Sequence, residues 1–356
     1  MKLNIRLRWL RDKLNALNIQ GMIVSNPVNI KYLTNIEAEG ELLITRKENV
    51  YLTDSRYIEA VNTALTIEDE VVVHDKRTML KEDYENFFLF CENVGFEECF
   101  VTYEQYKIMK QLFKVNDLVE TEHIIEKQRI QKDEKEIEKI KLACELTDEC
   151  FSHLLKFIKK GMTEKQISNE IERYFKDRGA DGIAFESVVA SGPNSSKPHS
   201  IATDRKIESG DVILLDFGCK YDGYCSDMTR TVFMDRIPEE VKKYYDIVLK
   251  NQMNVLEECK DGANIKTIIR MVESDFKVND LELIHALGHG VGMDIHELPV
   301  MSLKLDKVLK ENMVMAIEPG IYIPGKFGIR IEDSVLITKN GCINLTKSEK
   351  NYTIIS

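Results

Sequence analysis

The sequence has no long uninterrupted apolar segment. No stretch approaches the ~18 apolar residues of a membrane helix, and the opening segment MKLNIRLRWLRDKLNALNIQ places charges between its apolar residues. This segment also has no small-residue cleavage site, so we expect neither a signal peptide nor a transmembrane helix. We therefore expect a cytoplasmic protein without a membrane partner.

Basic residues are outnumbered. Lys and Arg number 49 against 60 Asp and Glu, a formal net charge of -11. Binding to nucleic acid through its phosphates needs the opposite balance, so we expect no nucleic-acid partner. C-x-x-C pairs are absent among the eight cysteines. Their scatter over a long chain predicts reduced, buried thiols.

Glycine and proline are scarce in the first part of the chain. The 356 residues, 43% of them apolar, are enough for about two domains with a core each. Only three of the 18 glycines and one of the seven prolines precede residue 161. The second part therefore has most of the tight turns, which is where sites tend to be built.

Alternating element types predict a first domain over residues 1–125. Leucines recur at helical spacing over residues 3–17, and GMIVS at 21–25 indicates a short buried strand. The runs ELLIT and NVYLT predict a hairpin around Arg46 to Glu48. This part of the chain is expected to form a compact α/β unit.

A highly charged segment begins the second domain. Of the 16 residues from Glu126 to Lys141, 11 are charged, but an apolar stripe that continues to Ile158 predicts one helix ended by Gly161. We place the domain boundary just before this helix, so that the second domain spans 126–356. A capping box of Thr and Gln at 163 and 166 predicts the next helix, running to residue 179.

The segment DVILLDFGCKYDGYCSDMTRTVFM at 211–234 predicts a β-hairpin. Its apolar runs flank Asp-Gly at 222–223, a strong two-residue turn. An unbroken register then sets Asp216 opposite Thr229, with Asp227 as its diagonal neighbour on the same face. Two carboxylates on a mostly apolar face need a cation, because burying unpaired charge is too costly.

Histidines cluster in the stretch HALGHGVGMDIHE at 285–297. Three of the seven histidines, His285, His289 and His296, lie there in a backbone too glycine-rich for a regular helix. The stretch is neither an H-E-x-x-H metal motif nor a dinucleotide-binding loop. The density of histidines indicates a site.

A third cluster, MVMAIEPGIYIPGKFGIRIEDSVLIT, spans 313–338. Its first apolar run ends at Glu318, and the second run contains Glu332, with Arg330 on the same strand face. His199 follows a proline in a separate loop and means little by itself.

Each of these residues also has a purely structural interpretation. Asp216 would cap a turn and Asp227 would pair with Arg230, while Arg330 and Glu332 would form a buried ion pair. Taken together, the candidates are four carboxylates and one histidine, an oxygen-rich set that suits two divalent cations. Such a set favours manganese over a thiolate-bound structural zinc. Two-metal sites are typical of hydrolytic enzymes.

The order of these motifs resembles one family. DFG and SDMTR, then HGVGMDIHE, EPGIYI and GIRIED, are similar to the pita-bread metallopeptidases, specifically to the two-domain Xaa-Pro aminopeptidases and prolidases. The resemblance spans the whole chain. It implies an α/β (α+β) fold in which a creatinase-type N-terminal domain precedes a pita-bread catalytic domain with a curved antiparallel sheet. It also implies a homodimer.

The resemblance implies a role for each matching residue. Two divalent ions, Mn²⁺ first and Co²⁺ or Zn²⁺ as alternatives, would be bound by Asp216, Asp227, His289, Glu318 and Glu332, with Asp227 and Glu332 bridging. His199 and His296 would bind the substrate and stabilise the tetrahedral intermediate, with support from Arg330 and Tyr322. Glu318 is the best general-base candidate. The other histidines, His74, His123, His153 and His285, are interpreted as structural or surface residues.

The expected activity is that of an Xaa-Pro aminopeptidase, which removes an N-terminal residue preceding proline from a peptide substrate. A strict Xaa-Pro dipeptidase (prolidase) is the first alternative. A catalytically inert binding protein and a metal-free creatinase-like hydrolase are disfavoured, because all five ligand positions have competent side chains. Preference for Met-Ala-Yaa over Xaa-Pro-Yaa would instead indicate a methionine aminopeptidase.

Overall fold

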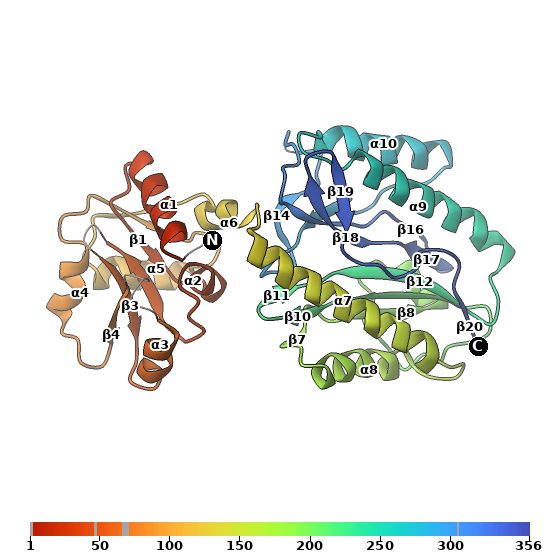
Figure 1. Cartoon of the computed structure of the whole chain (residues 1–356), viewed down its shortest axis with the longest axis horizontal. Helices are drawn as coiled ribbons and strands as arrows, with labels where there is room; N and C mark the ends of the chain where they lie inside the picture. Colours follow the sequence, from red (N-terminus) through yellow and green to blue (C-terminus); the bar gives the residue numbers. More distant parts are fainter. Residues whose placement is uncertain (1–2, 46–47, 66–70, 305) are drawn as a thin grey trace. The chain divides into compact units, whose positions relative to one another are not determined.

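The chain forms two units, Met1–Gln128 and Arg129–Ser356 (Figure 1). The computed structural model describes residues 3–45, 48–65, 71–304 and 306–356. Within these ranges, no helix has both the length and the apolar character needed to cross a membrane.

A six-stranded mixed sheet forms the centre of the first unit, in the order β4-β3-β2-β1-β5-β6. Strands β1, β5 and β6 are mutually parallel, and β2 is antiparallel to β1 and β3. The strands are β1 Gly21–Val24, β2 Glu41–Ile44, β3 Asn49–Thr53, β4 Val71–Asp75, β5 Asn93–Phe96 and β6 Asp117–Glu120. The helices are α1 Leu3–Ala16, α2 Pro27–Thr34, α3 Ile58–Ala64, α4 Lys81–Phe87, α5 Tyr103–Leu112 and α6 Ile124–Arg129.

The predicted elements of this unit are present. Helix α1 buries Leu7, Leu10 and Leu14, and the four residues of β1 are all buried. Strands β2 and β3 pair antiparallel as the predicted hairpin, in which Glu41 faces Leu52. Residues 46 and 47 of its turn, Arg and Lys, lie outside the described residues.

The second unit combines long helices with short, mostly antiparallel strands. Its helices are α7 Glu134–Phe157, α8 Glu164–Asp177, α9 Glu239–Glu258, α10 Ile265–Val278 and the 3-10 helix η2 Gly192–Ser196. Its strands up to residue 234 are β7 Gly182–Ile183, β8 Val188–Ser191, β9 Val212–Phe217, β10 Cys219–Tyr221, β11 Tyr224–Cys225 and β12 Met228–Met234. The later strands are β13 Gly288–Gly290, β14 Glu297–Val300, β15 Val314–Ile317, β16 Gly320–Ile323, β17 Phe327–Arg330, β18 Asp333–Thr338, β19 Gly341–Asn344 and β20 Ile354–Ile355.

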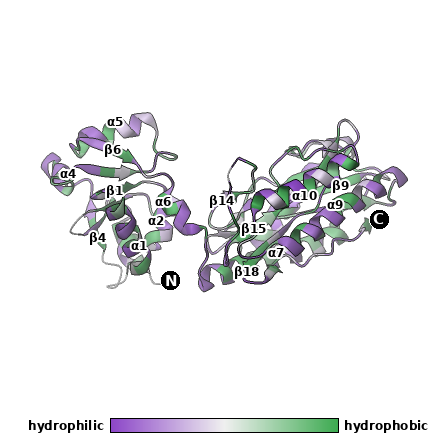
Figure 2. Ribbon diagram, turned by 90° about the horizontal axis from the view of Figure 1, so that it is seen from above, coloured by the Kyte–Doolittle hydropathy of each residue, from purple (hydrophilic) through white to green (hydrophobic). Residues whose placement is uncertain are grey.

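Two hydrophobic cores flank the strands of this unit. Helices α7 and α8 pack on β9 and β12 through one core, and α9 and α10 pack on β15, β17 and β18 through the other. Each pair of helices lies on its own side of the strands in Figure 1. The helices are amphipathic, and Figure 2 shows hydrophilic and hydrophobic colours alternating along α7 and α9. The largest sheets are β14-β13-β15-β18-β19 and β20-β12-β9-β8.

The helix expected over 126–161 is wrong as one element, because the structure has α6 and α7 instead. Asp133 lies between them in extended conformation, and its side chain accepts from the backbone N–H groups of Lys135 and Glu136. An N-cap of this kind starts a new helix rather than continuing the previous one. The helix α7 ends at Phe157, and Gly161 follows with a φ of +86°.

The capping box at Thr163 is confirmed. Its hydroxyl accepts from the Gln166 N–H, and the Gln166 side chain accepts from the Thr163 N–H. Helix α8 ends at Asp177, two residues before the predicted end.

The register of the predicted hairpin is confirmed both next to its turn and further along the strands. Tyr221 faces Tyr224 in β10 and β11, and Asp216 faces Thr229 in β9 and β12. The turn residue Asp222 has a φ of +45°, as the turn type requires. The sequence thus predicted which two carboxylates share a face.

Candidate metal centre

A cavity of about 510 Å³ opens between the strands of the second unit. Polar side chains from all three sequence clusters and from the loop after η2 line it: His199, Asp216, Asp227, His285, His289, His296, Glu318, Arg330 and Glu332. Apolar residues such as Phe185, Val188 and Ile295 complete the wall. The cavity therefore brings together residues more than 100 positions apart in the chain.

Asp227, His289 and Glu332 form the buried floor of this cavity. Each contributes a ligand atom, and these atoms all lie within 4.8 Å of one another. The Nε2 atom of His289 is 3.5 Å from Asp227 Oδ2 and 3.8 Å from Glu318 Oε1. Strand β13 positions this histidine, which faces Ala316 of β15.

Burial raises the pKa of each carboxyl group on this floor. The pKa of Asp227 lies well above its usual value because of burial and then the charges of Glu332, Asp216 and Glu318. For Glu332, burial and the charges of Glu318 and Asp216 act in the same direction. Burial also raises the pKa of Glu318 to about 7. Carboxylates packed this closely need positive charge to ionise together.

The imidazole of His289 is in its neutral form at neutral pH. Burial lowers its pKa to about 4, and its Nδ1 lies 3.0 Å from the Gly290 carbonyl oxygen. A hydrogen bond from Nδ1–H to this carbonyl leaves Nε2 free to act as an acceptor or ligand on the cavity side.

Arg330 is the buried cation of the centre. Its guanidinium donates to Asp216 Oδ2 at 2.5 Å, to the Tyr322 hydroxyl at 2.6 Å and to the Thr229 hydroxyl at 3.0 Å. The Thr229 hydroxyl in turn donates to Glu332 Oε2 at 2.5 Å. Arg330 therefore orients two of the carboxylates, one directly and one through Thr229.

The purely structural ion pairs expected for Asp227 and Glu332 are wrong. Arg230 pairs with Asp333 at 2.7 Å and donates to the Glu332 carbonyl oxygen, so Asp227 does not have it as a partner. Arg330 pairs with Asp216 rather than with Glu332.

His285 differs from its sequence interpretation as a packing residue, because its ring lines the cavity. Its Nε2 lies 3.0 Å from the Tyr322 hydroxyl, and its Nδ1 lies 3.9 Å from Glu318 Oε2. The sequence offered one signal, its position in the same histidine-rich stretch as His289. Thr229 was also overlooked as a site residue, although the hairpin register sets it opposite Asp216.

His199 and His296 lie at the accessible side of the cavity. Both rings are exposed on part of their surface, and the His296 ring stands edge-on to that of His289 with centroids 4.4 Å apart. Neither belongs to the group of atoms within 4.8 Å. His74 and His153, which we interpreted as structural or surface residues, do not line the cavity.

The residues present fit divalent cations. The four candidate carboxyl groups line the cavity beside the buried Arg330, and Asp216 Oδ1 is buried without a hydrogen-bond partner among the described residues. A buried carboxylate oxygen without a donor is a costly arrangement unless a cation binds it. Oxygen ligands with one imidazole suit Mn²⁺ and similar ions.

Comparison with known proteins decides the family. Residues 138–339 match the model of metallopeptidase family M24, and residues 6–131 match the creatinase/prolidase N-terminal domain. The chain is a member of metallopeptidase family M24. Its fold is the pita-bread fold preceded by a creatinase-type domain, as expected from the motifs, and its family is one of peptide hydrolases.

Relatives cover the whole chain. A Pyrococcus furiosus protein named Xaa-Pro dipeptidase is 34% identical, over 97% of this chain and 98% of its own. The structure of an Xaa-Pro dipeptidase from Bacillus anthracis has a TM-score of 0.93 at 33% identity, over 99% of this chain and 100% of its own. An X-Pro aminopeptidase structure from Thermotoga maritima has a TM-score of 0.87 at 31% identity, over 97% and 100%.

Proposed function

We propose that this M24 peptidase hydrolyses the bond between an N-terminal residue and proline, with two divalent cations in the cavity. The ions would be held by Asp216, Asp227, His289, Glu318 and Glu332. The observation that carries the proposal is the convergence of the Asp216, Asp227, Glu318 and Glu332 carboxyl groups and the neutral His289 imidazole on one cavity. The ions would supply Lewis acidity towards the scissile carbonyl and the attacking water.

Glu318 is the group that we assign to proton transfer. It accepts a proton from the attacking water at a carboxylate oxygen and returns it to the proline nitrogen as that bond breaks. Its partly exposed position in the cavity wall supports this role, since a general base must reach both water and substrate.

His199 and His296 would donate hydrogen bonds to the substrate carbonyl as negative charge develops on it. Their location at the accessible side of the cavity supports this role. Arg330 and Tyr322 act as positioning residues, because their mutual hydrogen bond and the Arg330–Asp216 ion pair hold a proposed ligand in place.

Specificity for proline follows from the chemistry of the bond. An Xaa-Pro bond is a tertiary amide without an N–H, so the site must recognise the pyrrolidine ring by its shape. The carboxylates of the cavity attract the free, cationic α-amine of the N-terminal residue, which favours exopeptidase action.

A strict Xaa-Pro dipeptidase is the second candidate. The names of the Pyrococcus and Bacillus relatives favour it, whereas that of the Thermotoga structure favours an aminopeptidase. The two activities differ in whether residues beyond proline are accommodated.

A peptide panel tests the proposal. We expect cleavage of Xaa-Pro and Xaa-Pro-Yaa, loss of cleavage on N-acetylation, and poor turnover when alanine replaces proline, each measured by release of the N-terminal amino acid. Cleavage of Xaa-Pro alone would make the protein a prolidase. Preference for Met-Ala-Yaa would overturn the proposal in favour of a methionine aminopeptidase.

The finer expectations stay predictions. They are manganese as the preferred ion, a homodimer, a cytoplasmic location, and a catalytic domain that begins at residue 126. Activity assays with each metal and a measurement of mass in solution address the first two.

A further inference from the structure

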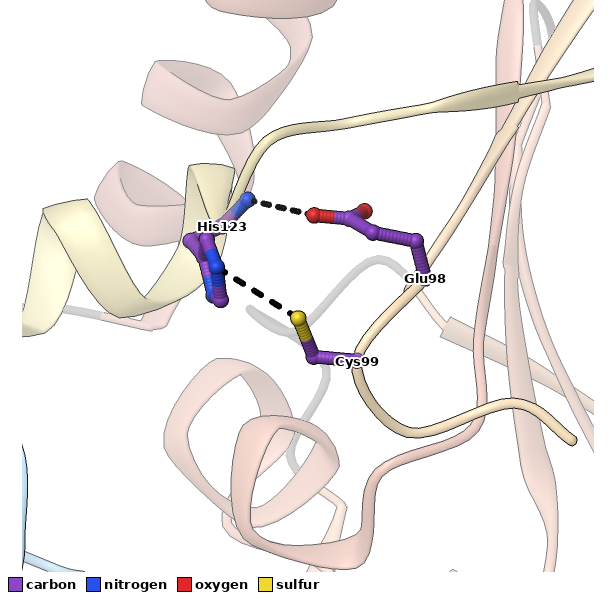
Figure 3. A group of neighbouring side chains, drawn as sticks. All are labelled: Glu98, Cys99 and His123. Atoms are coloured by element: carbon purple, nitrogen blue, oxygen red, sulfur yellow. Dashed lines mark hydrogen bonds between the residues drawn. The ribbon is translucent and has the colours of Figure 1, made fainter.

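A second group of metal-ligating side chains lies in the first unit, apart from the peptidase cavity. Glu98, Cys99 and His123 each offer a ligand atom, and these atoms lie within 4.8 Å of one another. Figure 3 shows the thiol and the imidazole facing each other, with the carboxylate beside them. The three residues border a small cavity of about 70 Å³.

The topology of the sheet explains why these residues meet. Glu98 and Cys99 follow strand β5, and His123 follows β6, its parallel neighbour. Asn26, which also lines the cavity, follows β1, the parallel neighbour of β5 on the other side. The carboxyl ends of parallel strands meet at one edge, the usual location of ligand sites in α/β sheets.

The backbone holds the histidine in an uncommon conformation. Glu122 and His123 have φ values of +49° and +59°, a region that residues with a side chain rarely occupy. The Glu98 carboxylate stabilises this turn by accepting from the His123 N–H at 3.2 Å and from the Thr121 N–H at 3.1 Å. Two successive residues with positive φ cost conformational free energy. Such strain is typical of residues whose side chains have a functional position.

We propose that Glu98, Cys99 and His123 form a binding site for Zn²⁺ or a similar borderline divalent ion, separate from the peptidase centre. The sulfur and nitrogen ligands select a transition metal over Ca²⁺ or Mg²⁺. The thiol of Cys99 loses its proton to solvent on binding, so the thiolate and the carboxylate balance the charge of the ion. Solvent completes the coordination, because Cys99 and His123 are exposed.

The geometry agrees with this assignment. Zn–S and Zn–N bonds at a tetrahedral angle set sulfur and nitrogen about 3.6 Å apart. Cys99 Sγ and His123 Nε2 are 3.4 Å apart. The surroundings are acidic as well, since Glu97 and Glu126 also line the cavity. The sequence interpretation of His123 as a structural or surface residue missed this partner.

Cobalt titration of the full chain tests the site. Co²⁺ bound by a thiolate has a charge-transfer band in the near ultraviolet, and the peptidase centre has no cysteine among its proposed ligands. After treatment with a chelator, we expect the band to level off at an intensity of one thiolate-bound Co²⁺ per chain, in addition to the ions that fill the peptidase cavity, and we expect Zn²⁺ to abolish it.

Variants assign the band to its ligands. Cys99→Ser and His123→Ala should abolish it, whereas Cys91→Ser, which changes another accessible cysteine of the same unit, should retain it. Circular dichroism confirms that each variant is folded. Absence of the band in the wild-type chain, or its persistence in Cys99→Ser, would overturn the proposal and leave a thiol–imidazole hydrogen bond. Because no cysteine is among the proposed ligands of the peptidase centre, the result is independent of the peptidase assays.

Discussion

Asp227 illustrates how the centre depends on individual residues. It is only 4% exposed, and its carboxyl group lies among three other carboxyl groups. Its position in the hairpin decides which way it points. Of the neighbours that raise its pKa, Asp216 belongs to the same hairpin, whereas Glu318 and Glu332 come from a segment about a hundred residues later. A cation bound there would remove the energetic cost of this crowding.

Replacing Asp227 by Asn tests its proposed role. The variant should lose at least one ion per chain, and turnover of an Xaa-Pro peptide should fall by more than about 100-fold. Metal analysis by mass spectrometry and a peptidase assay measure both. His199→Ala is the matched variant, which should keep its ions while losing turnover. Full occupancy and normal turnover in Asp227→Asn would contradict the ligand assignment.

The hairpin of β9 to β12 is the element that carries both aspartates. Gly218 interrupts it between β9 and β10, where a Cβ atom would lie 1.9 Å from the Ser226 carbonyl oxygen. This close approach lies two residues after Asp216, and Ser226 directly precedes Asp227. The glycine thus lets the hairpin bring the carboxylates to the cavity.

Gly218→Ala should therefore destabilise the second unit. The clash is with backbone, which cannot move aside as a side chain can, so we expect a loss of about 3 kcal/mol in the free energy of unfolding. Gly341→Ala is the control, because no atom of the described residues lies within 4 Å of a Cβ built there, and its effect should be below about 0.5 kcal/mol. Chemical denaturation of the full chain measures both. Equal stability of the two variants would refute the argument.

At the scale of the whole molecule, acidic residues are in excess, but a buried carboxylate can still stabilise the fold where basic residues surround it. Burial alone would raise the pKa of Glu297, but Lys132 and Arg129 outweigh it and hold the pKa at about 2. Lys132 Nζ lies 3.1 Å from this carboxylate, and Arg129 contacts it as well. The network links the segment before α7 to strand β14 within the second unit.

This network predicts how stability changes with pH. The pKa of Glu297 falls from 4.5 to about 2 on folding, so its stabilisation is complete above about pH 4.5 and is lost as the pH falls towards 2. The shift corresponds to about 3 kcal/mol. Unfolding of wild type and Glu297→Gln should differ by that order at pH 7 and converge in acid. A difference that is constant down to pH 2 would contradict this account.

The sequence by itself determined the local features. The Asp-Gly turn set the register that pairs Asp216 with Thr229, and the capping box started α8, because both depend on residues within a few positions. The order of motifs predicted the family and most of the polar residues that line the cavity, although not His285. The start of α7 could also have been predicted from the sequence, since Asp133 and Glu136 form a capping box.

Only the tertiary structure decided the partners. Arg230 binds Asp333 rather than Asp227, and Arg330 binds Asp216 across 114 positions, because strand order rather than spacing decides which side chains meet. Cys99 and His123 adjoin for the same reason, as the ends of neighbouring parallel strands. Spacing along a strand decides which face of the sheet a side chain lies on. Contacts between distant segments depend on how the strands and sheets pack, and the residue pattern of a single strand does not predict that packing.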